Sequence, residues 1–406
     1  MALCDGPAPR GTRGFTLIEM MIVIVLLVIM SGLMYETTLR TMEATEYAQI
    51  FNIMAIKAQR LSNALKEDLV TTKRLFEDGT DVGYFNALSL TPPPIDTTKL
   101  PKIEENDHFC ADSAAMTKTG NCLMFVKVEP AYSVEAAYKV DGLGDPVTRP
   151  VRVDLYRAVI YYLARPTNYQ GRSPLSQMAG GINLIRWQSV RFADKGQIDA
   201  LEIRDPTPAD AESLQSNVIA SLSDPADPDP ADPTDRPVGW APIEYCWDPT
   251  KPVDEAFFKF VEVGGVHGMQ DTTGDGVPDP VPGMSIEPAQ DVNQWKDQEL
   301  FDATAVLVDS DDSVGVSVSW NARHPALSAL NILSTQLPRK SPVLVPKFAI
   351  PIVDTTTDWF PNGLEVQVIG QSGYRQTLVR LVLTKETTRQ RIVAHESTTI
   401  VSTRDF

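Results

Sequence analysis

The feature of this chain that most restricts its fold is an apolar run near the N-terminus, Phe15 to Met34, which contains one acidic residue, Glu19. A helix of about 20 residues is about 30 Å long, which matches the hydrocarbon thickness of a bilayer. Arg10 and Arg13 precede the run, and no basic residue follows until Arg40. Because flanking basic residues stay cytoplasmic, we expect a single-pass membrane helix with a cytoplasmic N-terminus and the remaining chain on the other side of the membrane.

The acidic residue in this run needs a physical reason. An acid at the centre of a spanning helix costs roughly 2.5 to 3.5 kcal/mol, and such residues usually mark a partner or a function. In the alternative interpretation, Glu19 lies near the cytoplasmic end and reaches the headgroups. An ordinary secretory signal fits poorly, because its apolar region is shorter and its cleavage site follows that region. Here the candidate cleavage site precedes the apolar run.

Gly14 followed by Phe15-Thr-Leu-Ile-Glu19 resembles the processing site of type IV prepilins and type II secretion pseudopilins. The resemblance implies that a prepilin peptidase cleaves after Gly14 and methylates the new amino terminus of Phe15. It also implies that Glu19 attracts the amino terminus of a neighbouring subunit, an attraction that low-dielectric surroundings strengthen. The implied partners are the peptidase, the inner membrane, and other minor and major pilins or pseudopilins.

The rest of the sequence predicts an α+β fold, in which the long N-terminal helix packs on a mainly antiparallel β-sheet domain with an inserted loop-rich subdomain. Apolar residues at spacings of three or four continue the helix to near Phe76. We expect these segments: a leader peptide at 1–14, a transmembrane helix at 15–34, its periplasmic extension at 35–78, a pilin-like β-rich domain at 79–223, an acidic Pro-rich linker at 224–237, the inserted subdomain at 238–362, and C-terminal antiparallel strands at 363–406.

Alternating polarity and β-branched or aromatic residues predict the strands of this domain. The predicted strands are Leu123–Val128, Val151–Leu163, Ile182–Phe192 and Gln197–Ile203, and a closing meander of Leu364–Ile369, Tyr374–Thr384 and Arg389–Val401. A helix is predicted over Thr207–Leu222. This layout resembles J-type minor pseudopilins and W-type minor pilins, although this chain is larger. A bulky domain is hard to fit at every position of a packed shaft, so we expect a tip position.

The charge of the chain limits which partners it can bind, and its cysteines indicate a candidate disulfide. The net charge of −17 and the lack of a dense basic cluster disfavour nucleic-acid binding. Cys4 lies in the leader, so three cysteines would remain in an oxidising periplasm. A disulfide between Cys110 and Cys122 would close a short loop and contribute roughly 3 kcal/mol. Cys246 would then be unpaired, and its state stays open.

A second chemical signal is the Asp-rich segment Asp271-Thr-Thr-Gly-Asp-Gly-Val-Pro-Asp279, which resembles an EF-hand or thrombospondin type 3 loop. Alternate positions can direct oxygen ligands to one structural Ca²⁺ ion. The candidate ligands are Asp271, Thr273, Asp275, the Val277 carbonyl and Asp279. Pro282 stands where an EF-hand has its bidentate Glu. A solvated acidic turn is the alternative interpretation.

Enzyme motifs are weak in this sequence. His395-Glu396 lacks the second histidine of a HExxH zinc site, and no catalytic residues are predicted. We therefore expect a non-catalytic minor pilin or pseudopilin that initiates or caps a type IV pilus or a type II secretion pseudopilus. A signal-anchored periplasmic calcium-binding protein for adhesion or ligand binding is the alternative, and an anchored hydrolase is a third. The sequence does not choose between pilus assembly and protein secretion.

Overall fold

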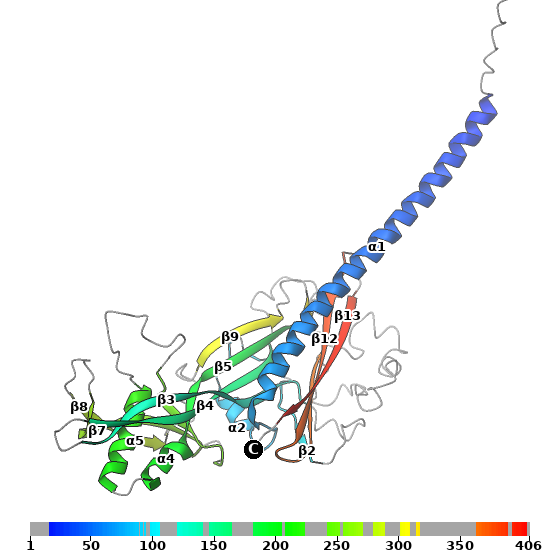
Figure 1. Cartoon of the computed structure of the whole chain (residues 1–406). Helices are drawn as coiled ribbons and strands as arrows, with labels where there is room; N and C mark the ends of the chain where they lie inside the picture. Colours follow the sequence, from blue (N-terminus) through cyan, green and yellow to red (C-terminus); the bar gives the residue numbers. More distant parts are fainter. Residues whose placement is uncertain are drawn as a thin grey trace, which may run out of the picture. The chain divides into compact units, whose positions relative to one another are not determined.

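The chain has the predicted α+β fold in a computed structural model, with one long apolar helix and two mainly antiparallel sheets (Figure 1). Contacts divide it into an N-terminal unit, Met1–Ile53, and a C-terminal unit, Met54–Phe406. The structure describes residues 16–88, 90–91, 93–94, 98–105, 120–140, 146–164, 182–204, 208–223, 242–251, 255–270, 279–288, 301–308, 314–316, 363–388 and 392–403.

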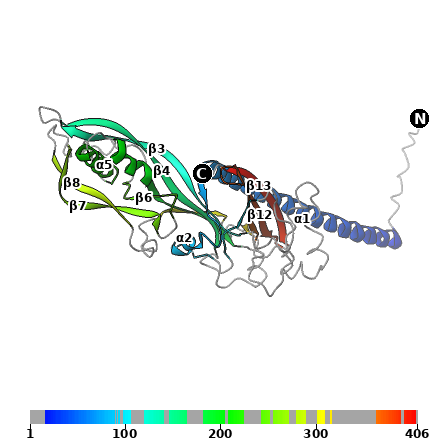
Figure 2. The ribbon, with the colours of Figure 1, turned by 90° about the horizontal axis from the view of Figure 1, so that it is seen from below.

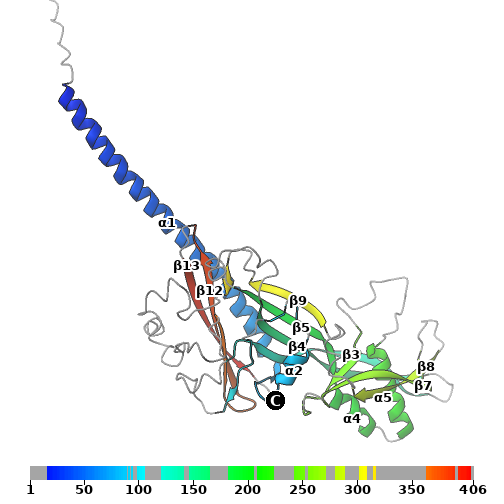
Figure 3. The same cartoon turned by 180° about the vertical axis from the view of Figure 1, so that it is seen from behind.

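Helix α1 covers Leu17–Val70, and its last turns belong to the C-terminal unit. In that unit the helix buries one stripe of side chains at spacings of three and four, which is the pattern of an amphipathic helix. The stripe consists of Met54, Ala58, Leu61, Leu65 and Leu69. These turns pass beside strand β13, Ile392–Thr403, where the hydroxyl of Thr399 donates a hydrogen bond to that of Ser62 at 2.9 Å (Figure 3).

The predicted end of this helix near Phe76 is wrong, because the helix ends at Val70. Strand β1, Thr72–Leu75, follows directly and pairs antiparallel with β3, Leu123–Val140. β-branched residues at the junction favour a strand over a helix. Strand pairing also buries Leu75 and Phe76 in the core, which the apolar spacing alone had assigned to the helix.

The larger sheet has eight strands among the described residues, in the order β1-β3-β4-β5-β6-β7-β8, with β9 paired to β5. The long strands β3 and β4 (Pro146–Ala164) contain the predicted strands at 123–128 and 151–163, and β5 (Asn183–Asp194) covers all but the first residue of the one predicted at 182–192, so these three strands are confirmed. The shorter strands are β6 (Tyr245–Trp247), β7 (Phe257–Gln270), β8 (Asp279–Pro288) and β9 (Phe301–Val308). Strands β6 to β9 thus extend this sheet.

Two helices follow β5, and only the second was predicted. Helix α5, Pro208–Ser223, confirms the helix expected at 207–222 and lies between β3 and the β7–β8 pair (Figure 2). The strand expected at 197–203 is wrong, because this segment lies in helix α4, Lys195–Arg204. The carboxylate of Asp194 accepts a hydrogen bond from the N–H of Gln197 at 2.9 Å, which starts the helix, and Ile198 and Leu201 are buried at helical spacing.

The smaller sheet confirms the predicted C-terminal meander. Strand β12, Arg375–Glu386, pairs antiparallel with β11, Leu364–Ile369, and with β13. Short strands β2, Ile103–Glu104, and β10, Gly315–Val316, complete the five described strands. Gly370, at the turn between β11 and β12, has φ of +104°, which favours glycine.

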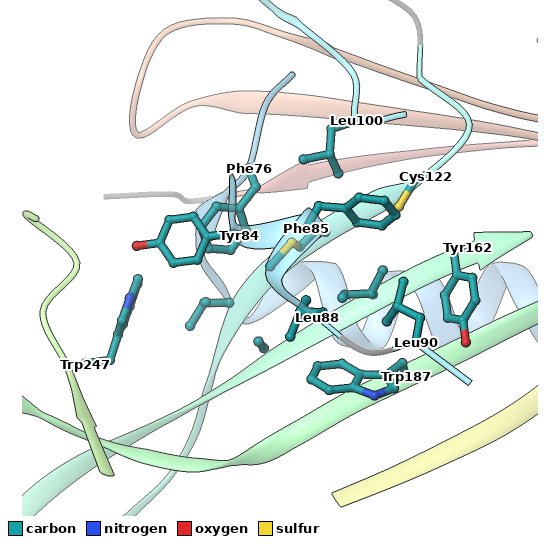
Figure 4. Close-up of a cluster of buried hydrophobic side chains, with 14 of the residues drawn as sticks. Phe76, Tyr84, Phe85, Leu88, Leu90, Leu100, Cys122, Tyr162, Trp187 and Trp247 are labelled. Carbon is teal, nitrogen blue, oxygen red and sulfur yellow. The ribbon is translucent and has the colours of Figure 1, made fainter. Parts of the chain in front are cut away.

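Among the described residues, two cores of buried side chains lie against the larger sheet. The first core includes Phe76, Tyr84 and Phe85 around the short helix α2, Val82–Ala87, together with Trp187 and Trp247 (Figure 4). The second core surrounds α4 and α5. It contains Val134, Val151, Val153, Leu155, Ile198, Leu214, Val218 and Leu222.

Candidate functional site

The first turn of α1 holds the acidic residue predicted to mediate assembly. Thr16 precedes the helix, and its backbone N–H and hydroxyl both donate to Glu19 Oε2 at 2.9 Å. The N–H of Glu19 in turn donates to Thr16 Oγ1 at 3.3 Å. This reciprocal pair is a capping box, which satisfies backbone donors that a helix start otherwise leaves open. The carboxylate also lies at the positive end of the helix dipole.

The capping box was missed by sequence reasoning, although a threonine followed three residues later by glutamate before an apolar run is its signature. It fixes the start of α1 at Leu17, three residues after Gly14. Gly14 and Phe15 themselves lie outside the described residues, so cleavage between them stays a prediction. Glu19 therefore has a local role, holding the helix start, beside the predicted role in assembly.

The surface of α1 after the capping box is apolar on all sides. From Leu17 to Met34 every large apolar side chain is more than half exposed in the isolated chain. Among the described residues, α1 is the helix long and apolar enough to cross a membrane. A helix that is apolar all round needs a bilayer or other helices to cover it. The segment is therefore suited to membrane anchoring and to packing against similar helices.

The other end of α1 is fixed by a buried carboxylate, Asp68, within the C-terminal unit. Its Oδ2 accepts hydrogen bonds from the Tyr161 hydroxyl at 2.6 Å and from Arg186 Nε at 2.7 Å. Its Oδ1 accepts from Arg186 Nη2 at 3.1 Å and from Lys127 Nζ at 3.2 Å. These partners lie on β3, β4 and β5, so Asp68 joins the helix to three strands.

The protonation of Asp68 follows from these contacts. Burial alone raises the pKa of this carboxyl. The hydrogen bonds from Arg186 and Tyr161 and the charges of Arg186 and Lys127 outweigh burial, so the pKa lies below its usual value. Sequence reasoning missed this site. The available signal was an acid at the helical spacing of the buried stripe, seven residues after Leu61.

The predicted calcium segment lies in the connection between β7 and β8. Gln270 and Asp279 pair with each other at the ends of these antiparallel strands, so residues 271–278 connect two paired strands. Residues 271–278 lie outside the described residues, so the calcium site stays a prediction. The described part of the chain has no group of three or more His, Cys, Asp or Glu side chains suited to a metal.

The cysteines lie in different cores. Cys122 is in the first core and Cys246 in the second, and both described thiols are fully buried and free of a disulfide with each other. Burial raises the pKa of both thiols above the usual range, which makes them poor nucleophiles. Cys110 lies outside the described residues, so its predicted pairing with Cys122 stays a prediction.

Comparison with known proteins supports the assignment of the N-terminal segment. Residues 9–35 match the family model described as the prokaryotic N-terminal methylation motif. No curated protein and no solved structure matches the chain. This match supports the predicted prepilin-like character of the N-terminal segment, and it favours a structural over an enzymatic role. His395 lies in β13, which confirms the predicted strand and not a HExxH helix.

Proposed function

We propose that this protein is a minor pilin or pseudopilin that initiates or caps a type IV pilus or a type II secretion pseudopilus. The observation that carries the proposal is the methylation motif at 9–35, followed by an all-round apolar helix whose first turn holds Glu19. A cleaved and methylated Phe15 would sit one helical turn before this acid. Sister subunits shifted along the helix axis would then pair an amino terminus with a carboxylate.

The proposed place at the filament tip rests on size. The C-terminal unit runs from Met54 to Phe406, and its described residues form two sheets and at least two buried cores. A head of this size is difficult to repeat at each step of a shaft, whereas the tip leaves room. The helix would be inserted in the inner membrane before assembly, with the C-terminal unit in the periplasm.

Mass spectrometry of the full chain produced together with a prepilin peptidase tests the processing step. We expect a mature protein that begins with N-methylated Phe15. Gly14→Ala and larger substitutions should block cleavage, because a side chain hinders the close approach of the protease to the backbone. A native chain that retains Met1–Gly14 would contradict the proposal.

Co-purification with other pilin-like subunits tests assembly. Glu19→Ala should still be cleaved but should reduce incorporation, and the native protein should occur in far fewer copies than the major subunit. Normal incorporation of this variant would remove the pairing mechanism. A processed chain that never joins a filament would instead favour the anchored binding protein.

A further inference from the structure

A row of three basic side chains crosses one face of the larger sheet. Lys127 on β3 lies directly opposite Arg157 on β4, and Arg157 lies directly opposite Arg191 on β5. Side chains at directly opposite positions point to the same face of a sheet, so these three cations are neighbours on adjacent strands. Like charges in such positions repel each other, and nearby anions are needed to offset the repulsion.

This row of cations lies between two packed regions of the same face. Residues two apart on a strand share a face, so Arg157 is on the same face as Leu155 and Tyr161. Leu155 belongs to the second core, and the hydroxyl of Tyr161 donates to Asp68 of α1. The row is therefore placed between the core around α4 and α5 and the end of α1, within the C-terminal unit.

Two described carboxylates reach this row, and both already pair with other cations. Glu129 Oε1 lies 3.1 Å from Lys127 Nζ and 3.6 Å from Arg157 Nε. Asp68 pairs with Lys127 and, through both of its oxygens, with Arg186. Each acid thus serves two cations, and neither pairs with the arginine at the β5 end of the row.

Arg191 is the cation that the described chain leaves without a partner. Its side chain is partly exposed, but its Nε is buried and has no hydrogen-bond partner. No described carboxylate pairs with its guanidinium. Buried polar groups are nearly always hydrogen-bonded, and an unmade bond is more costly for a charged group. Arg191 therefore offers donors that an anion would accept.

The burial of the neighbouring side chains favours a small anion over a partner protein. The side chains of Lys127, Glu129 and Arg157 are 18%, 15% and 10% exposed. The surface of another protein has little access to groups that are covered to this degree. A free ion needs only the exposed part of the Arg191 guanidinium to enter.

The fork of a guanidinium favours an anion with more than two oxygens. A carboxylate uses both of its oxygens when one arginine binds it in a bidentate manner. A phosphate group has further oxygens, which would remain to face the positive charge of Arg157 on the next strand. A phosphate-type anion therefore offsets the repulsion between the two arginines as well as satisfying Arg191.

We propose that Arg191, beside Arg157, binds the phosphate group of a small free anion on this face of the sheet. A lipid headgroup carries the same phosphate chemistry, so the test includes both sources. The site lies wholly in the C-terminal unit and is independent of cleavage at Gly14. Its failure would therefore leave the proposed role in filament assembly unaffected.

The test titrates the full chain in uncharged detergent micelles with sodium phosphate at constant ionic strength. We expect saturable heat in isothermal titration and a melting temperature that rises with phosphate, because the ion binds the folded state. Sodium acetate at the same ionic strength should give neither. Arg191→Gln should weaken phosphate binding at least about tenfold. Arg152→Gln, which removes an exposed arginine 3.7 Å from Asp154, is the matched control and should leave binding unchanged.

Stability without phosphate separates a binding role from a structural one. Arg191→Gln should keep or raise the melting temperature in phosphate-free buffer, because it removes a like charge opposite Arg157. Arg191→Lys keeps the charge but loses the fork, so phosphate affinity should be intermediate. A lower melting temperature for Arg191→Gln in phosphate-free buffer would overturn the proposal, because this arginine would then have a structural partner within the chain.

Three further results would overturn the proposal. The first is the absence of saturable phosphate binding, and the second is equal binding by the native chain and Arg191→Gln. The third is a rise in melting temperature when phosphatidylglycerol is added to the micelles without any response to sodium phosphate, which would assign the site to a lipid headgroup.

Discussion

At the scale of single residues, two carboxylates define the ends of α1. Glu19 closes the capping box with Thr16 at the start, and Asp68 binds Tyr161, Arg186 and Lys127 near the end. Both carboxylates accept hydrogen bonds, but their exposure to solvent differs. Glu19 is solvent-exposed in the isolated chain and therefore accessible to a partner, whereas Asp68 is buried and therefore committed to the fold.

The two roles of Glu19 can be separated with Thr16. Thr16→Ala removes the N-cap hydroxyl and should weaken the helix start by about 1 kcal/mol while leaving the Glu19 charge in place. Glu19→Gln keeps an acceptor in the first turn but removes the charge. If charge pairing drives assembly, Glu19→Gln should lose incorporation into filaments and Thr16→Ala should largely keep it. Thr16→Ser, which preserves the capping box, is the control, and equal losses in both variants would instead identify the cap as the determinant.

The Asp68 site predicts a large stability effect. Asp68→Asn leaves Arg186 buried without its charge partner, and such a loss typically costs about 3 to 5 kcal/mol. Urea unfolding of the full chain in detergent should give a lower midpoint for Asp68→Asn than for the native chain. Glu67→Gln, at the exposed neighbouring position of the same helix, should change the midpoint little. Equal midpoints for the two variants would contradict the role assigned to Asp68.

The same site predicts a pH dependence with a defined sign. Because the folded-state pKa of Asp68 lies below its ordinary value of 3.8, the folded state binds this proton less readily than the unfolded state. The stabilisation should be complete well above pH 3.8 and should decline as the pH falls through 3.8 towards the folded-state pKa. Asp68→Asn should lack this part of the acid dependence when unfolding is followed by circular dichroism. An unchanged acid slope would exclude Asp68 as its source.

At the scale of elements, the sequence predicts the helices and strands that follow a regular apolar pattern. It does not predict those whose type or boundary depends on a local contact. The long strands β3, β4 and β5 and the C-terminal meander were predictable, because apolar or β-branched side chains line at least one buried face of each strand. Helix α4 was not predictable, since its apolar residues fit both periods and the Asp194 cap decides the outcome. The end of α1 was also missed, because pairing with β3 overrides a continuing helical spacing.

The smaller sheet contains a buried ion network that strand patterning did not predict. Arg380 on β12 donates to Glu365 Oε2 on β11 at 2.9 Å and to Glu396 Oε1 on β13 at 2.7 Å. The Arg380 and Glu365 side chains are 5% and 8% exposed. Burial lowers the pKa of Arg380, but the two carboxylates outweigh it and hold the guanidinium charged.

Removal of this arginine should destabilise the meander more than removal of the whole pair. Arg380→Met leaves Glu365 buried without its cation, which typically costs about 3 to 5 kcal/mol. The double variant Arg380→Met with Glu365→Leu replaces the pair by apolar groups and should recover much of that loss. A double-mutant cycle in urea measures the difference. Additive effects would show that the pair is energetically uncoupled.

At the scale of the whole molecule, the larger sheet joins segments that are distant in the sequence. Strand β9 pairs with β5, and β6 connects β5 to the β7–β8 hairpin. Strands β6 to β9 are therefore part of the same sheet as β3 to β5. The β7–β8 hairpin also contacts α5, since Met284 N–H donates to the Ser216 hydroxyl at 2.8 Å. A change in the hairpin loop can thus reach the second core.

This connection gives the predicted calcium segment a measurable consequence. We propose that one Ca²⁺ ion binds the β7–β8 loop through Asp271, Thr273, Asp275, Val277 and Asp279. An ion that binds only the folded state stabilises it by mass action, and a loop that carries three carboxylates resists closure without a cation. Calcium at about 1 mM should therefore raise the melting temperature of the full chain, and chelator should reverse the rise.

Matched variants locate the effect in the loop. Asp275→Asn with Asp271→Asn should abolish the calcium response and should raise stability slightly without calcium, because carboxylate repulsion is relieved. Asp248→Asn, an acid outside the hairpin that accepts a hydrogen bond from the Thr250 hydroxyl at 2.6 Å, should keep the response. Isothermal titration gives the number of ions bound. If the melting temperature is the same with calcium and with chelator, the loop is a solvated acidic turn and the hairpin is held by strand pairing and its contact with α5 alone.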